Sequence, residues 1–458
     1  MKLKVDARLD PQFAPLSVVC RDMREATKND GQDLVIAIER NKGYTTTYKT
    51  RVFKDGTGHD EENFRFVERM TKALLWVAGG YKVIIAGSEV IGNKIKEAFS
   101  DGGLRDFDVH FMERVYECPF EVEIRKLEDA PEDKSAAAPI GRHLDGCRIG
   151  FDAGGSDRKV SAVINGESVY SEEVVWFPKT NSDPDYHYQG ILEAMKTAAS
   201  HMPRVDAIGV SSAGVYVDNR IMVASLFLKV SDEDFDKKVK NMYIDVAKEI
   251  GENIPIEVAN DGDVTALAGA MDLNDNAVLG VAMGTSEAGG YVDPQGNITG
   301  WLNELAFVPV DFCENAMVDE WSGDYGCGVK YFSQDGVIKL APFANIQIDE
   351  NLSPAEKLKV VQGLMKEGDP RAAAIYDTIG AYFGYAIAFY TEFYDIKHVL
   401  IMGRVTSGEG GVILLERAQE VLDKEFPELA KKITLHIPDE NSRRVGQSVA
   451  AASLPEIK

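Results

Sequence analysis

Cysteine is scarce in this sequence of 458 residues. The chain has 5 cysteines, an odd number, and they are widely spaced. Such a set does not form the disulfide framework of a small secreted protein, so we expect a reducing, cytoplasmic compartment. The N-terminal segment, MKLKVDARLDPQF, also lacks the apolar core of a signal peptide.

Long apolar runs and an excess of basic residues are also missing. The most apolar stretch, residues 74–88, contains the pair Gly79-Gly80 and Lys82 and is too short to cross a bilayer. The chain has 50 Lys and Arg against 74 Asp and Glu, which gives a net charge of −24. Since this charge repels nucleic acids and anionic membranes, we expect neither as a partner.

The length and the ordinary hydrophobic content of 45% predict two or three compact units. Residues 127–141 combine acids, prolines and small residues without apolar periodicity, as a linker does. We therefore expect an N-terminal α/β domain over residues 1–126 and a linker over 127–145. The strands expected before the linker are 34–38, 44–53 and 82–88, and the helices are 62–77 and 90–99.

After the linker, strand hairpins are followed by alternating strands and helices, and this order occurs twice. Such a pattern predicts two similar α/β halves. We expect a first lobe over residues 146–270, completed by about 436–458, and a second lobe over 271–435. The main strands expected are 147–152, 207–211, 256–259, 277–283 and 398–402, and the main helices are 189–200, 232–250, 263–271, 370–394 and 412–426.

A turn with two glycines, Asp152-Ala-Gly154-Gly155-Ser156, separates the first two strands of the first lobe. Paired glycines let the backbone approach a phosphate closely and present N–H groups to it. Asp152 can hold Mg²⁺ through water, and the Ser156 hydroxyl can bond a phosphate oxygen. Taken alone, the turn is better explained as a plain tight hairpin.

Two further glycine turns follow apolar strands. The first contains Gly284 and Thr285 and suits a second phosphate clamp. The other contains Gly403 and Gly410 and precedes a helix, where an adenine ring can lie against backbone. Three such turns, in this order and on these elements, indicate a nucleotide site more specifically than any one of them.

A fourth motif, Val258-Ala-Asn260-Asp261-Gly-Asp263, lies where a buried strand meets a helix. One of the two aspartates is expected to cap the helix, and Asp263 suits that role. Asp261 is then left at the strand end, where its carboxylate can accept a proton from a hydroxyl nucleophile. We interpret Asp261 as a candidate catalytic base.

The ordered motifs of residues 146–458 resemble those of the ROK family (repressors, uncharacterised frames and sugar kinases). They are DAGGS, VSSAGVYVDN, VANDGDVTALAGA, AMGTSEAGGYV, NELAF, GCGVKYFS and LIMGRVTSGEGG. The resemblance implies an actin/hexokinase-like (ribonuclease H-like) two-lobed α/β fold, here preceded by an extra N-terminal α/β domain. It also implies ATP-dependent, Mg²⁺-dependent phosphorylation of a sugar or sugar-like hydroxyl.

The resemblance assigns roles to individual residues. It implies a first phosphate loop formed by Asp152, Gly154, Gly155 and Ser156, and a second one formed by Gly284 and Thr285. On the acceptor side, Asn260 would hold a sugar hydroxyl, with Gly214 beside the sugar, and Glu304 would be the glutamate of the family's E-x-G-H motif. Asp261 would be the catalytic base.

The chain departs from the family pattern on the acceptor side. Ala306 and Phe307 replace the glycine and histidine of E-x-G-H, and Val329 replaces a sugar-contacting glutamate. Of the family's zinc-binding cysteines, Cys327 alone has an obvious counterpart, so we predict no zinc. In the second phosphate loop, Glu287 is expected to add negative charge near the phosphates.

These departures leave three interpretations open. The first is a carbohydrate kinase, and the second is a ROK-like sensor that binds a sugar or nucleotide without catalysis. The third is a kinase for a non-sugar alcohol, which the apolar Phe307 would allow. The N-terminal domain has no winged-helix pattern, which argues against DNA binding. A small-molecule acceptor and a nucleotide are the expected partners, and a homodimer is left open.

Overall fold

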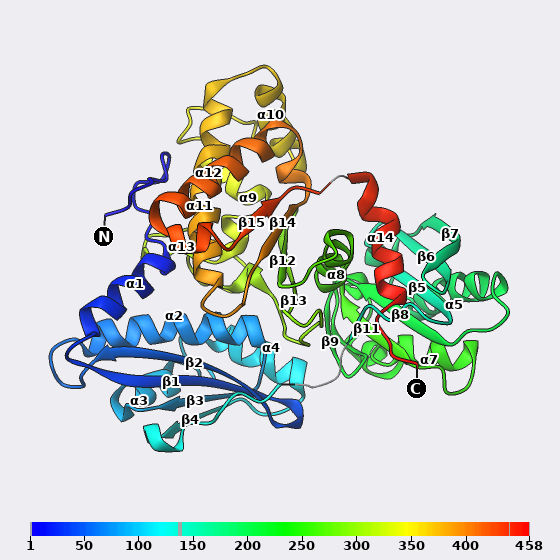
Figure 1. The fold of residues 1–458 in the computed structure, drawn as a ribbon, viewed down its shortest axis with the longest axis horizontal. Helices are drawn as coiled ribbons and strands as arrows, with labels where there is room; N and C mark the ends of the chain where they lie inside the picture. Colours follow the sequence, from blue (N-terminus) through cyan, green and yellow to red (C-terminus); the bar gives the residue numbers. More distant parts are fainter. Residues whose placement is uncertain (1, 136–139, 439, 458) are drawn as a thin grey trace. The chain divides into compact units, whose positions relative to one another are not determined.

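The structure is a computed structural model that describes residues 2–135, 140–438 and 440–457. It divides into two compact units (Figure 1). Residues 136–139 of the predicted linker lie outside the described residues. Unit 1 comprises Met1–Ala136, Val281–Gly289 and Trp301–Ile437, and unit 2 comprises Ala137–Gly280, Gly290–Gly300 and Pro438–Lys458. Among the described residues, no helix is long and apolar enough for a membrane span.

Unit 2 is built on a five-stranded sheet with the strand order β11-β8-β5-β6-β7. The strands β5, β6 and β7 are antiparallel, β8 runs parallel to β5, and β11 runs parallel to β8. The strand bounds are β5 Cys147–Ala153, β6 Asp157–Ile164, β7 Glu167–Val175, β8 Ala207–Ser212 and β11 Ile256–Asn260. The carboxyl ends of β5, β8 and β11 therefore meet at one edge of the sheet.

The two faces of this sheet are covered differently because successive strand residues point to opposite sides. Ile149 and Phe151 point into the core with α5 (Pro184–Ser200) and α7 (Met242–Ile250). Gly150 lies on the opposite side, against α14 (Glu440–Ala452). A Cβ on Gly150 would lie 1.9 Å from the carbonyl oxygen of Ser448, so this close helix approach requires glycine.

The helix predicted over residues 232–250 is interrupted. It consists of α6 (Asp232–Asp234), a wide π-helical turn (Phe235–Val239) and α7. The Lys240 carbonyl accepts a hydrogen bond of 2.9 Å from the amide of Ile221 on β10 (Arg220–Val223). This bond draws the Lys240 carbonyl away from the helix ladder, which explains the break.

A second sheet has the strand order β13-β12-β14-β15, and β14 and β15 lie entirely in unit 1. The long buried helix of unit 1, α11 (Pro370–Tyr390), packs against α12 (Glu409–Glu425), and α10 (Pro354–Lys366) contacts both. On α11, Gly384 faces α12, and a Cβ there would lie 2.7 Å from the Ala418 carbonyl oxygen. The strand bounds are β12 Val278–Met283, β13 Glu287–Val292, β14 His398–Met402 and β15 Thr434–His436. Unit 1 also holds α9 (Gln334–Leu340) and α13 (Pro427–Ala430), whereas α8 (Asp261–Leu273) belongs to unit 2.

The N-terminal part of unit 1 is an α/β layer with the strand order β2-β1-β3-β4. Figure 1 shows α2 lying along this sheet. The prediction missed α1, α4 and β4. The bounds are α1 Leu16–Thr27, β1 Gly31–Arg40, β2 Tyr44–Phe53, α2 Asp60–Ala78, β3 Lys82–Ala86, α3 Glu89–Ala98, α4 Asp106–Tyr116 and β4 Glu121–Arg125.

Helix α2 is buried on all sides along its second half. Every residue from Phe66 to Ala78 is buried, including Glu68, Arg69 and Lys72. The sequence predicts only a single apolar face for this helix. A helix buried all round lies inside a core, so α2 is an internal element of unit 1 rather than a surface helix.

Candidate functional site

The first glycine turn lies at the carboxyl end of β5, between β5 and β6. Asp152 is buried, and its Oδ1 accepts a hydrogen bond of 2.9 Å from the Ser211 hydroxyl on β8. Burial raises the pKa of Asp152 to about 6, and the nearby charge of Asp261 adds to the shift. Gly155 and Ser156 are exposed, so their backbone is accessible to a ligand.

Asn260 and Asp261 lie at the junction of β11 and α8. The N-cap of α8 is Asn260, whose Oδ1 accepts from the Gly262 amide at 2.7 Å. The predicted capping role of Asp263 is therefore wrong. Asp263 is buried within the first turn, and its carboxylate accepts from the Tyr291 amide at 3.0 Å.

The carboxyl ends of three strands bring several predicted residues of unit 2 together. Ala153 of β5 is in register with Ser212 of β8, and Ser212 is in register with Asn260 of β11. The Asn260 amide also donates to the Gly214 carbonyl at 2.8 Å. Asp261 is partly exposed, and the loss of surrounding water raises its pKa.

Two polar residues of this strand edge were missed by the sequence prediction. Ser211 orients Asp152, and its own hydroxyl oxygen accepts a bond of 3.2 Å from Gln447. Lys179, in the 3₁₀ turn Pro178–Thr180, lies against Gly155. Ser211 could have been found from the Val-Ser-Ser run at the end of an expected strand. No sequence motif includes Lys179.

The second glycine turn lies in unit 1, at the end of β12. The Thr285 hydroxyl accepts a bond of 2.7 Å from the guanidinium of Arg404, which directly follows Gly403 in the third glycine turn. Gly403 has a φ of 99°, and a Cβ there would lie 2.3 Å from the Met283 carbonyl oxygen. Close approach of β14 to β12 thus requires this glycine, and Arg404 links the two turns.

In unit 1, the surroundings of Glu287 and Gly410 can be explained by burial and packing. The predicted negative charge of Glu287 near the phosphates is wrong, because its side chain is buried and burial raises its pKa to about 8. Its Oε1 accepts a long bond of 3.4 Å from the Tyr390 hydroxyl. A Cβ on Gly410 would lie 2.6 Å from the Tyr376 ring, so packing alone explains that glycine.

The segment that contains Glu304 is hydrogen-bonded to the C-terminal end of α2. The amides of Asn303 and Glu304 donate to the carbonyls of Val77 and Trp76 at 3.0 and 3.1 Å. These carbonyls lie in the last turn of α2, where no further helical amide can reach them. The Phe307 ring lies on Trp76, with a centroid distance of 4.3 Å. The N-terminal part of unit 1 therefore supports the candidate acceptor-binding glutamate.

The residues around Cys327 do not fit a zinc ion. Burial raises the pKa of the Cys327 thiol to about 12, and within the described residues Cys327 belongs to no group of three or more possible metal ligands. The Cys327 sulfur lies 3.7 Å from Asp324 Oδ2, and Asp324 is paired with Arg69 at 3.0 Å and Lys72 at 2.9 Å. These buried cations would repel a divalent metal.

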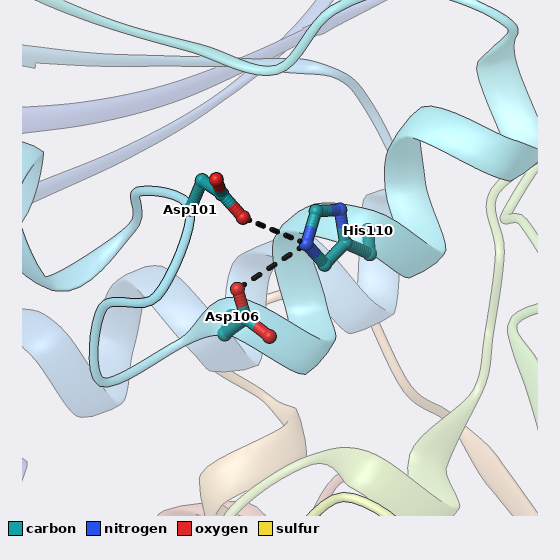
Figure 2. A group of neighbouring side chains, drawn as sticks. All are labelled: Asp101, Asp106 and His110. Atoms are coloured by element: carbon teal, nitrogen blue, oxygen red, sulfur yellow. Dashed lines mark hydrogen bonds and ion pairs between the residues drawn. The ribbon is translucent and has the colours of Figure 1, made fainter.

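Asp101, Asp106 and His110 are the one group of possible metal ligands found among the described residues (Figure 2). His110 Nε2 lies 3.1 Å from Asp101 and 3.2 Å from Asp106. A hydrogen bond to Glu113, together with these two carboxylates, raises the pKa of His110. The group is on the surface and its acids are already paired with the imidazole, so we assign it no ion.

Comparison with known proteins identifies the family of this chain and several similar structures. A search of curated proteins gives no match. A ROK hexokinase from Thermus thermophilus has a TM-score of 0.51 and 18% identity, covering 67% of this chain and 97% of its own. A ROK transcriptional regulator homologous to the E. coli MLC protein has a TM-score of 0.50 and 17% identity, covering 68% and 79%.

A third solved structure is a ROK family glucokinase from Streptomyces griseus in complex with glucose and AMPPNP. It has a TM-score of 0.47 and 18% identity, covering 67% of this chain and 99% of its own. The similar structures with the higher scores confirm the actin/hexokinase-like fold predicted from the motifs. The ROK family model matches residues 148–448, roughly two thirds of the chain. The chain belongs to the ROK family.

Proposed function

We propose that this protein is a cytoplasmic carbohydrate kinase that transfers a phosphoryl group from ATP to a hydroxyl of a sugar or sugar-like alcohol. The observation that carries the proposal is the pair of carboxylates in unit 2. Asp152 and Asp261 lie at the carboxyl ends of strands in one sheet, and the charge of Asp261 affects the pKa of Asp152. Ligands of open α/β sheets bind at such strand ends.

The two carboxylates suit different tasks. Asp261 has a raised pKa, as a general base operating near neutral pH requires, and it would accept the proton of the attacking hydroxyl. Asp152 offers a buried carboxylate oxygen, a ligand type suited to Mg²⁺ through water. Bound Mg²⁺ would neutralise charge on the phosphates. The amides of Gly154 and Gly155 and the hydroxyl of Ser156 would orient the phosphate oxygens.

Residues of unit 1 complete the assignment. Gly284 and Thr285 would bind phosphate as the second loop, with Gly403 and Gly410 near the adenine. The family assignment makes Glu304 an acceptor-binding residue, and it gives the same role to Asn260 and Gly214. Support comes from the family membership, from the hydrogen bond that Arg404 donates to the Thr285 hydroxyl, and from the backbone hydrogen bond of Glu304.

We expect nucleotide binding to depend on the ionisation of Asp152. Its pKa is raised to about 6, so the proton competes with Mg²⁺ below that pH and not above it. The apparent affinity for Mg·ATP should fall as the pH drops from 7 to 5, approaching about tenfold per pH unit. Titration calorimetry at several pH values measures this, and Asp152→Asn should bind weakly with no such slope. A wild-type affinity independent of pH would contradict the role.

A coupled ADP-release assay over hexoses, amino sugars and polyols tests the proposed reaction. We expect acceptor-dependent ADP release with at least one member of the panel. The alternative is a non-catalytic sensor, favoured by Phe307, which lies in an aromatic cluster with Trp76 instead of offering a polar group. A sensor would show ligand-dependent thermal stabilisation without turnover, and that result would overturn the kinase proposal.

A further inference from the structure

We propose that Lys179 is an additional phosphate-binding residue that contacts the terminal phosphates of the nucleotide. The inference rests on the proposed function, because it assumes that the Asp152–Ser156 turn binds ATP. None of the family motifs includes this lysine, and the observations that support it all lie within unit 2.

The Lys179 side chain crosses the phosphate turn at its second glycine. A Cβ placed on Gly155 would lie 2.7 Å from Lys179 Cε and 2.9 Å from Nζ. Real Cβ atoms do not approach heavy atoms so closely, so the glycine leaves the space that the lysine occupies. The ammonium group is thereby placed beside the exposed backbone that would receive the phosphates.

Buried neighbours hold the backbone of this lysine in place. Trp176, 3% exposed, donates its indole N–H to the Gly154 carbonyl at 2.8 Å and its amide to the Ser156 carbonyl at 3.1 Å. His187 is fully buried and lies within hydrogen-bond distance of the Pro178 carbonyl, at 3.0 Å. The turn that carries Lys179 is therefore attached to the phosphate turn on one side and to the core on the other.

The side chains near the phosphate turn include several carboxylates, so phosphate binding there requires a cation. Asp152 is part of the turn, Asp157 follows it, and the charges of Asp157 and Asp261 raise the pKa of Asp152. Such carboxylates repel the phosphates of ATP. Lys159 is already paired with Asp157 at 3.1 Å. Lys179 has no such ion pair in the described chain. Its positive charge partly opposes the rise that burial causes in the pKa of Asp261.

Lysine is a common phosphate ligand because its ammonium group acts as a compact point charge with three donors. An exposed ammonium beside a glycine turn can bind phosphate without first losing another partner. This availability distinguishes Lys179 from Lys159, which would have to leave Asp157. Lys179 is thus the nearby cation best placed to offset the charge of the phosphates.

The test compares ATP and AMP binding to the full chain carrying Lys179→Met. We expect the Kd of Mg·ATP to rise about ten- to a hundredfold, since a charge-assisted contact is lost, while AMP binding stays unchanged. Lys179→Arg should retain most of the affinity for ATP. Lys196→Met, which removes an exposed lysine of α5, is the matched control and should bind both nucleotides normally. Isothermal titration calorimetry measures each Kd.

The outcomes separate this inference from the proposed function. If wild-type protein binds neither ATP nor AMPPNP, the proposed function fails and the role of Lys179 fails with it. If wild-type protein binds ATP and Lys179→Met binds it equally well, the inference alone is overturned. An equal loss for ATP and AMP would also overturn it, because the lysine would then not act on the terminal phosphates. Thermal unfolding confirms that each variant is folded.

Discussion

Asp261→Asn should lower kcat by a factor on the order of 10² to 10⁴ with little change in the KM for ATP. The asparagine keeps the size of the side chain and an oxygen that can accept the Gly262 amide, which lies 3.1 Å from Asp261 Oδ1. It cannot accept the proton of the acceptor hydroxyl. The fold and nucleotide binding should therefore survive while the chemical step slows. Steady-state kinetics with an acceptor found in the ADP-release assay measures the effect.

A second aspartate on the same helix provides the control. Asp272 is exposed near the other end of α8, so Asp272→Asn makes the same chemical change away from the strand ends. We expect wild-type kinetics for this variant. Full turnover by Asp261→Asn would remove Asp261 from the role of base. A raised KM for the acceptor with an unchanged kcat would make it a binding residue instead.

The strand-end motifs of unit 2 were predictable because their signals are local. An apolar strand that ends in Asp152 or Asn260, followed at once by a turn or helix, can be recognised from a short window of sequence. The error at Asp263 is also local. Asparagine and aspartate both cap helices well, and the choice depends on which side chain reaches the Gly262 amide.

The remaining features depend on contacts between distant residues. Helix α2 shows an ordinary amphipathic pattern, and its complete burial follows from packing against parts of the chain such as Asp324, 255 residues after Arg69. The raised pKa of Glu287 could not be predicted for the same reason, because it comes from burial that no motif encodes. Tertiary context also places Lys179 at Gly155, through the anchoring of Trp176.

Asp324→Ala is the second change with a large expected effect, a loss of about 3–5 kcal/mol in the free energy of unfolding. Asp324 is buried and receives ion pairs from Arg69 at 3.0 Å, Lys72 at 2.9 Å and Arg105 at 2.7 Å. Removing the carboxylate leaves three buried cations with only Glu68 and Asp108 to balance them. Urea denaturation monitored by circular dichroism measures the change.

An exposed ion pair offers a matched control. Glu314 pairs with Arg65 at 3.0 Å, but its side chain is 72% exposed, so Glu314→Ala should cost less than about 1 kcal/mol. A similar small cost for Asp324→Ala would show that water or a rearranged side chain replaces the carboxylate. The cluster would then contribute little to unit 1.

The pH dependence of stability provides an independent check on Asp324. Its cationic neighbours hold the pKa of this carboxyl far below its usual range, although burial opposes the shift. The folded pKa is thus lower than the unfolded value of about 4, so the stabilisation is complete above that pH and is lost as the pH falls below it. Asp324→Ala should therefore lose less stability than wild type between pH 5 and pH 3, because the remaining acid groups titrate in both proteins. Identical losses in the two proteins would mean that Asp324 is not an ionised partner of Arg69 and Lys72.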